Sequence, residues 1–147
     1  MKEVAYQPAG YQNVIPYLHV DGAARVIAFM KEVFSAEEIA IYSRPDGTVG
    51  HAAFRIGDSV IELADSGEEW PAMPCALQVY VPDTEAAYHR ALKAGATSLV
   101  KPAKQFYGDF TASVKDMCGN NWYIATQVEV ISKEEVDKRI AAMASQH

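Results

Sequence analysis

The chain has few of the residues that mark a specialised class of protein. Its two cysteines, Cys75 and Cys118, form no metal-ligand spacing and are too few among 147 residues for a disulfide framework. Basic residues are not in excess: the formal net charge is −6, which argues against a general nucleic-acid binder and mildly favours cationic or neutral ligands. No apolar run approaches the length of a membrane span, and no secretory signal is visible at the N-terminus. We therefore expect a cytoplasmic protein that binds neither nucleic acid nor membrane.

The sequence does contain an internal repeat. The stretch 17–21 and the helical pattern after it recur about 61–62 residues later, as 78–83 and a second helical pattern. Each copy ends in a strand that begins near a glycine, Gly57 in the first copy and Gly119 in the second. Two copies are too few for a solenoid, and they indicate two half-domains that share a site. Half of the residues are hydrophobic, which is enough for one domain with a sizeable core.

Hydrophobic periodicity predicts the same elements in both copies. In the first helix, Val26, Phe29, Met30, Val33 and Phe34 follow the spacing of an amphipathic helix. Strands are predicted from alternation and from turn residues such as those of 45–47. The predicted strands are 14–20, 38–43, 51–56, 59–64, 76–81, 98–100, 110–115 and 122–127, and the predicted helices are 23–34, 84–94 and 132–144. Residues 65–74 are polar and contain proline, so we interpret them as a linker between the halves.

Each half is therefore β-α-β-β-β, and the fold class is α+β. We expect a single domain over 1–147, with modules at about 12–66 and 74–128 and a C-terminal helix at 132–144 that opens with the capping box of Ser132 and Glu135. In each half, the single helix covers only one face of the four-stranded sheet, and the other face needs a different partner. Two such sheets can curl around a cleft.

Strand alternation predicts which side chains line this cleft. In each strand the more apolar face should pack on the helix, and the mixed face should turn to the cleft. The predicted lining is Tyr17, His19, His51, Arg55, Glu62, Gln78, Tyr80 and Tyr123. Aromatic walls with a few polar groups are typical of a small-molecule site.

The chain resembles the vicinal oxygen chelate superfamily of glyoxalases, bleomycin-resistance proteins and dioxygenases, and within it the PhnB-like branch. The resemblance is carried by 15–20, 51–59, 107–109 and 115–126, and by the tail 132–143. It implies paired βαβββ modules around a cleft, a homodimer, and a metal site whose ligands come from the first and last strands of each module. Those positions fall here at Ile15, Glu62, Ala76 and Tyr123, of which only Glu62 binds divalent cations well.

Three functions remain open from the sequence. The first is binding of a small aromatic or cationic compound in the cleft, without the full metal site and without a cofactor. The second is a divalent-metal-dependent lyase, isomerase or dioxygenase in which Glu62 is the catalytic base or, with His51 and His19, a ligand of Zn, Ni, Fe or Mn. The third is a non-catalytic structural or regulatory protein. We expect the first.

Overall fold

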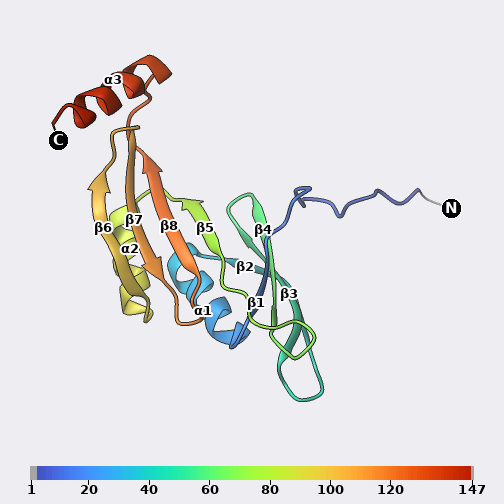
Figure 1. The fold of residues 1–147 in the computed structure, drawn as a ribbon. Helices are drawn as coiled ribbons and strands as arrows, with labels where there is room; N and C mark the ends of the chain where they lie inside the picture. The colour runs from blue at the N-terminus through green and yellow to red at the C-terminus, as the bar shows by residue number, and fades with distance from the viewer. Residues whose placement is uncertain (1–2, 147) are drawn as a thin grey trace. The chain divides into compact units, whose positions relative to one another are not determined.

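The computed structural model describes residues 3–146, and Figure 1 shows its fold. The chain divides into two compact units, the first ending at Cys75 and the second beginning at Ala76. Both units have the βαβββ order, which confirms the predicted α+β fold class. The first unit contains β1 (Tyr17–Val20), α1 (Ala23–Phe34), β2 (Glu37–Ser43), β3 (Val49–Ile56) and β4 (Ser59–Asp65). The second contains β5 (Ala76–Tyr80), α2 (Thr84–Lys93), β6 (Thr97–Lys104), β7 (Asp109–Lys115), β8 (Asn121–Gln127) and α3 (Lys133–Ala144).

The sheet of the first unit has the strand order β1-β4-β3-β2. The first strand runs parallel to β4, and the other neighbours are antiparallel. The register places Tyr17 beside Glu62, and Glu62 beside Ala53. Because side chains alternate along a strand, Tyr17 and His19 share one face of the sheet, while Leu18 and Val20, both 1% exposed, lie on the other.

The core of the first unit lies between α1 and this second face. The apolar stripe of α1 is buried as its spacing predicts, and α1 contacts β3 and β4. Its N-terminus is held by the end of β4: one Asp65 carboxylate oxygen accepts hydrogen bonds from the N–H groups of Gly22 (3.1 Å) and Ala23 (2.8 Å). The other oxygen accepts from Val49 N–H at 2.7 Å. Asp65 thus replaces the side-chain cap that Gly22 cannot supply.

The second unit repeats this plan with the strand order β5-β8-β7-β6. Helix α2 contacts β6, β7 and β8, and it lies behind the sheet in Figure 1. At the position equivalent to Asp65, the Thr126 hydroxyl group accepts a hydrogen bond from Thr84 N–H at 3.1 Å. Asp83 also caps α2 by accepting from Ala86 N–H. In each unit, the strand that pairs with the first strand (β4 or β8) therefore holds the start of the helix that covers the sheet.

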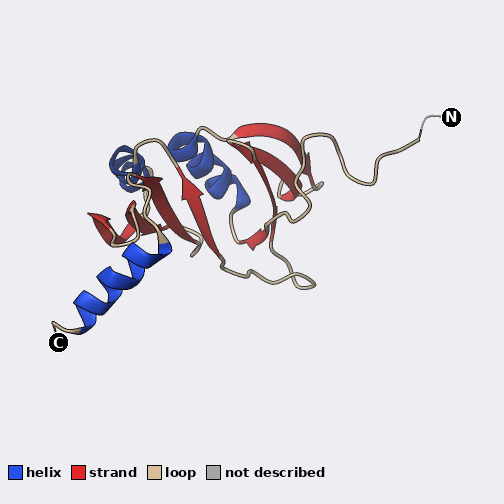
Figure 2. Cartoon of the chain, turned by 90° about the horizontal axis from the view of Figure 1, so that it is seen from above, coloured by secondary structure: helices blue, strands red, loops and turns tan. Residues whose placement is uncertain are grey.

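Helix α3 buries none of its residues and is tied to the second unit by charge. Figure 2 shows this helix, next to the C-terminus, extending away from the strands of its unit instead of covering them. Arg139 donates to Glu129 at 2.8 Å and to the Phe106 carbonyl at 3.0 Å. The hydrogen bonds from Arg139 and Lys104 lower the pKa of Glu129 to about 2. None of the helices within residues 3–146 has both the length and the apolar character needed to cross a bilayer.

Three sequence predictions differ from the structure in extent. The first strand begins at Tyr17 and not at residue 14, and the Val14 side chain is 84% exposed. Proline at 16 has no N–H to donate, so only its carbonyl pairs with the sheet, accepting from Glu62 N–H at 3.0 Å. Strand β6 spans Thr97–Lys104, whereas the sequence predicted only its start at 98–100, because an edge strand tolerates Pro102 and needs no buried alternation. The predicted linker 65–74 is partly structural, since Asp65 ends β4.

Candidate functional site

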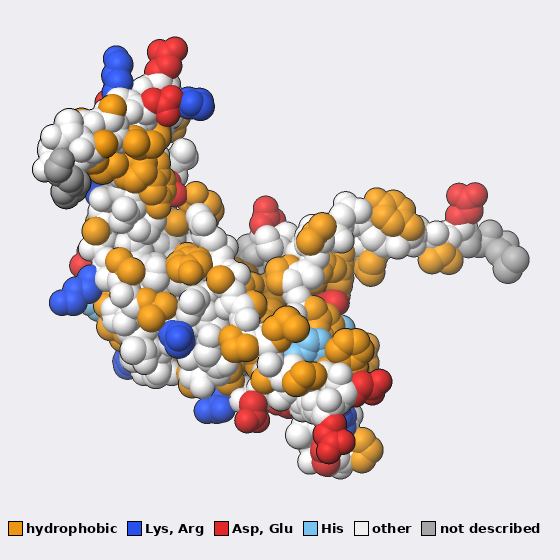
Figure 3. All heavy atoms as spheres, in the orientation of Figure 1, with side chains coloured by type: hydrophobic (Ala, Val, Ile, Leu, Met, Phe, Trp, Pro, Cys, Tyr) orange, Lys and Arg blue, Asp and Glu red, His pale blue; other side chains and the backbone are white. Residues whose placement is uncertain are grey.

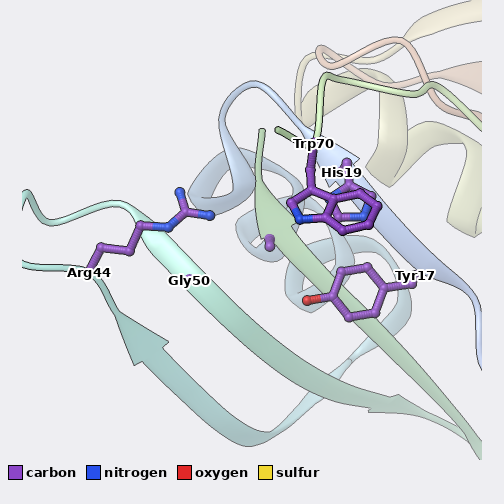
Figure 4. Close-up of a pocket in the computed structure, with 6 residues that line it drawn as sticks. Tyr17, His19, Arg44, Gly50 and Trp70 are labelled. Carbon is purple, nitrogen blue, oxygen red and sulfur yellow. The ribbon is translucent and has the colours of Figure 1, made fainter. Parts of the chain in front are cut away.

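A pocket of about 460 Å³ opens on the first unit, and Figure 4 shows its lining. The face of the sheet opposite the core supplies Tyr17 and His19 from β1 and Ala64 from β4. Gly50 of β3 adds a position without a side chain. Arg44, from the turn after β2, and Trp70, from the segment after β4, complete the lining. All six residues belong to one unit.

Five rings follow one another across this face. The Trp70 ring is stacked on His19, with centroids 5.5 Å apart and planes 11° apart. His19 lies 5.0 Å from Tyr17, Tyr17 lies 5.8 Å from His51, and His51 lies 6.2 Å from Tyr42. Figure 3 shows histidine atoms among hydrophobic side chains over the strands of this unit. Ring faces that remain open to solvent are a surface on which a planar molecule can stack.

His19 has a polar atom that the fold does not satisfy. Its Nδ1 is buried and has no hydrogen-bond partner among residues 3–146. A buried polar atom without a partner costs about 1–3 kcal/mol, so such an atom in a pocket wall calls for an explanation.

Tyr17, His51 and Glu62 form a chain of polar contacts beside the pocket. The Tyr17 hydroxyl oxygen lies 3.1 Å from His51 Nδ1, and His51 Nε2 lies 3.6 Å from a Glu62 carboxylate oxygen. Burial and the Glu62 charge raise the pKa of Tyr17, while Arg44 acts in the opposite direction. The phenol is therefore protonated at neutral pH. When Glu62 holds the His51 proton on Nε2, Nδ1 accepts from Tyr17.

Arg44 reaches the pocket from the side opposite these rings. In Figure 4 its guanidinium group and the Tyr17 hydroxyl group both point towards the middle of the pocket. One nitrogen donates to the Thr48 hydroxyl group at 3.2 Å, and another donates to the Asp65 carbonyl at 3.0 Å. These two contacts hold the guanidinium group at the rim.

The structure brings four of the predicted site residues together, and Arg55 of the same unit lies apart from them. Tyr17, His19, His51 and Glu62 lie on one face of the first sheet. Arg55 lies near the opposite end of β3 from Gly50, where it donates to the Gly10 carbonyl at 2.8 Å. Gln78, Tyr80 and Tyr123 belong to the second unit, so their predicted place in a shared cleft stays a prediction.

The second unit has a polar group of its own on the corresponding face. Gln78 is beside Tyr123 in the register of β5 and β8. Tyr80 donates to the buried carboxylate of Asp109 at 2.8 Å. That hydrogen bond, followed by burial, raises the pKa of Tyr80. Tyr80 therefore supplies a neutral hydroxyl group.

Sequence reasoning missed Trp70, Arg44 and Tyr42. Trp70 lies in the predicted linker, and its chain is brought to β1 by a hydrogen bond from Met73 N–H to the His19 carbonyl at 2.9 Å. A tryptophan between charged residues and proline, in a segment with no periodic pattern, was the available signal. Tyr42 lies in β2, where every residue except Ala40 is exposed, so no alternation marks it. Arg44 gave no signal beyond its place next to the turn.

Comparison with known proteins gives the family. The sequence model of the glyoxalase/bleomycin resistance protein/dioxygenase superfamily matches residues 14–124. The chain belongs to this superfamily. An uncharacterized protein of Mycobacterium bovis is 32% identical in an alignment of 142 positions, which covers 89% of this chain and 91% of that protein.

Solved structures of other proteins share the fold. TioX from Micromonospora sp. ML1 matches with a TM-score of 0.68 and 19% identity, over 80% of this chain and 99% of that one. A PhnB protein from Bacillus cereus matches with a TM-score of 0.61 and 18% identity, over 78% and 99%. At these identities the likeness concerns the fold and not the ligand.

The metal site of the glyoxalase superfamily does not fit the residues of this chain. At the positions that the resemblance implies, Ile15 and Ala76 have no donor atom in their side chains, and Glu62 is the one good ligand. Glu62, His51 and His19 lie on one face of the sheet, but they do not form a metal site: residues 3–146 hold no group of three or more histidine, cysteine or acidic side chains placed to bind a metal ion. We derive no step through a metal.

Proposed function

We propose that this glyoxalase-superfamily protein binds a small planar aromatic molecule in the pocket of its first unit, without a metal ion. The observation that carries the proposal is the row of rings that ends in Trp70. The Trp70 side chain is 61% exposed although it is stacked on His19, so one face of the stack is free for a ligand. Aromatic stacking of this kind adds about 0.5–1.5 kcal/mol per ring pair beyond the burial of apolar area.

The composition of the pocket supports the same class of ligand. Its wall combines three aromatic side chains with few polar groups, and its volume suits a molecule of two or three fused rings. The superfamily includes bleomycin resistance proteins, whose name refers to a small molecule. We also expect a homodimer. We expect Gln78, Tyr80 and Tyr123 to contribute side chains to the binding site.

We expect naphthalene derivatives to bind in the pocket, and the NMR signal of the Trp70 indole N–H to report this binding. The chain has two tryptophans, so an NMR spectrum shows two indole N–H signals. A ligand in the pocket should shift the Trp70 signal and leave that of Trp122 in place, because Trp122 is fully buried and donates to Asp116 at 2.8 Å. Calorimetry should show a loss of affinity of about tenfold in Trp70→Ala and a smaller loss in Trp70→Phe, which keeps a ring.

The matched control is Tyr6→Ala, since Tyr6 is also an exposed ring but lies outside the pocket. Equal affinities of the wild type and Trp70→Ala would contradict the proposal. A titration in which neither indole signal moves would also contradict it.

A second candidate function is enzymatic proton transfer, which the Tyr17–His51–Glu62 chain favours. In this role Glu62 would hold His51 as a base for a proton next to a carbonyl group. The probe is 2-acetylnaphthalene in D₂O, with methyl exchange followed by NMR. Enzymatic transfer predicts that Glu62→Gln slows exchange by about 10²–10⁴-fold and leaves binding unchanged. Our preferred function predicts no protein-dependent exchange in either form.

A further inference from the structure

The pocket contains a cation whose charge no nearby carboxylate neutralises directly. Among residues 3–146, no carboxylate lies within 4.0 Å of the Arg44 guanidinium group. The acidic residues whose charges interact with Arg44 are Asp46 and Asp65. Asp46 accepts from the Thr48 N–H and hydroxyl group at 2.9 and 2.6 Å. Asp65 accepts from three backbone N–H groups. Both carboxylates are therefore committed to other donors.

The fold holds Arg44 in place. Its backbone closes a turn, with Arg44 N–H donating to the Thr48 carbonyl at 2.8 Å and Gly47 N–H donating to the Arg44 carbonyl at 2.9 Å. The stem of the side chain lies over Gly50, where a Cβ atom would come within 3.2 Å of Arg44 Cγ. Gly50 thus leaves the space that the stem occupies. The Thr48 hydroxyl group and the Asp65 carbonyl accept from two of the five N–H donors of the guanidinium group, which leaves donors for a ligand.

Glu62 does not balance this charge inside the pocket. Its carboxylate lies 3.6 Å from the His51 ring, and Glu62 is not among the lining residues. The net charge of −6 mildly favours a cationic or neutral ligand, but the tertiary structure places Arg44 at the rim of the pocket. The other walls are rings, an alanine and a glycine. The charged group that a ligand meets first is therefore positive.

We propose that the ligand is a planar aromatic acid, whose ring stacks on Trp70 and His19 and whose carboxylate or other planar anionic group is bound by Arg44. This inference rests on the proposed function and adds the charge of the ligand. Guanidinium groups bind carboxylates through paired, charge-assisted hydrogen bonds. The Tyr17 hydroxyl group supplies a further polar contact for the same ligand.

The test compares three probes that share one ring system and differ in charge: 2-naphthoate, 2-naphthamide and 2-naphthylmethylammonium. With the full chain, calorimetry should show 2-naphthoate binding about tenfold tighter than 2-naphthamide, and the ammonium probe binding most weakly. Arg44→Gln should reduce the affinity for 2-naphthoate to that for 2-naphthamide and leave the affinity for 2-naphthamide unchanged. Arg44→Lys, which keeps the charge but not the paired geometry, should fall between them.

The outcomes separate the two proposals. Equal binding of the acid and the amide, tightest binding of the ammonium probe, or an equal loss for acid and amide in Arg44→Gln would overturn the aromatic-acid inference. Each of these would leave the proposed function standing, provided that Trp70→Ala still weakens binding. Failure of all three probes to bind or to shift the Trp70 indole signal would overturn both. Melting temperatures of the variants identify any loss of binding that comes from unfolding.

Discussion

Asp116→Ala is expected to lower the free energy of unfolding by about 3–4 kcal/mol, because several buried donors lose one acceptor at once. The Asp116 carboxylate accepts from Trp122 Nε1 at 2.8 Å and from the Asn120 side-chain amide at 3.0 Å. It also accepts from the backbone N–H groups of Cys118 and Asn120, at 2.9 and 3.0 Å. Asn120 and Trp122 are both fully buried. One side chain therefore holds the turn between β7 and β8 and the largest residue of the core.

Urea denaturation followed by far-UV circular dichroism measures the effect, since the tryptophan signal itself changes in this variant. Asp116→Asn should lower the free energy of unfolding by less than Asp116→Ala, because the amide keeps one acceptor oxygen. It should still lower it, because the amide NH₂ group faces donors that the carboxylate accepted from. The matched control is Asp58→Ala in the corresponding hairpin of the first unit, where the exposed Asp58 carboxylate accepts a hydrogen bond from the Ser59 hydroxyl group at 2.9 Å. A loss in Asp116→Ala no larger than that in Asp58→Ala would show that the carboxylate does not hold the turn.

Asp65→Ala is expected to cost about 2–3 kcal/mol at pH 7, because three backbone N–H groups lose their acceptor and α1 loses its cap. The cost should depend on pH. Burial acts to raise the pKa of Asp65, but the hydrogen bonds from Ala23, Val49 and Gly22 outweigh it and lower the pKa. A carboxylate with a lowered pKa in the folded state contributes its full stabilisation above its unfolded pKa of about 4. That contribution is lost as the pH falls through the lowered folded value.

The gap between the wild type and Asp65→Ala should therefore be constant from pH 7 to pH 5 and narrow at pH 3. Urea denaturation at the three pH values measures it. Asp65→Asn retains an acceptor without a titrating charge, so it should cost less than alanine at pH 7. A gap of constant size down to pH 3 would show that the ionised form is not what stabilises α1.

Much of the fold was predictable because its signals are local. The stripe of α1 and the alternation along β1 and β5 indicate which side chains are buried without reference to the rest of the chain. The weaker signals failed where burial is slight: β6 is mostly exposed along its length, and its C-terminal half was missed. The first strand was predicted too long because alternation at 14–16 is not accompanied by backbone pairing through Pro16.

The candidate site was predictable only in part, for the same reason. Period-two alternation is enough to place Tyr17, His19, His51 and Glu62 on one face once the strands are known. Trp70 and Arg44 are not on that face by periodicity. Trp70 depends on a backbone hydrogen bond to His19 from a segment without regular structure, and Arg44 depends on an acceptor in Asp65, 21 residues further along the chain.

The sequence by itself determined the repeated βαβββ order, the superfamily and the polar face of the first sheet, because each of these is expressed in the spacing of neighbouring residues. Only the tertiary structure decided that Trp70 closes the row of rings and that Arg44, instead of Glu62, meets the pocket. The physical reason is that hydrogen bonds between distant segments set the direction of these side chains, and no local pattern records such bonds.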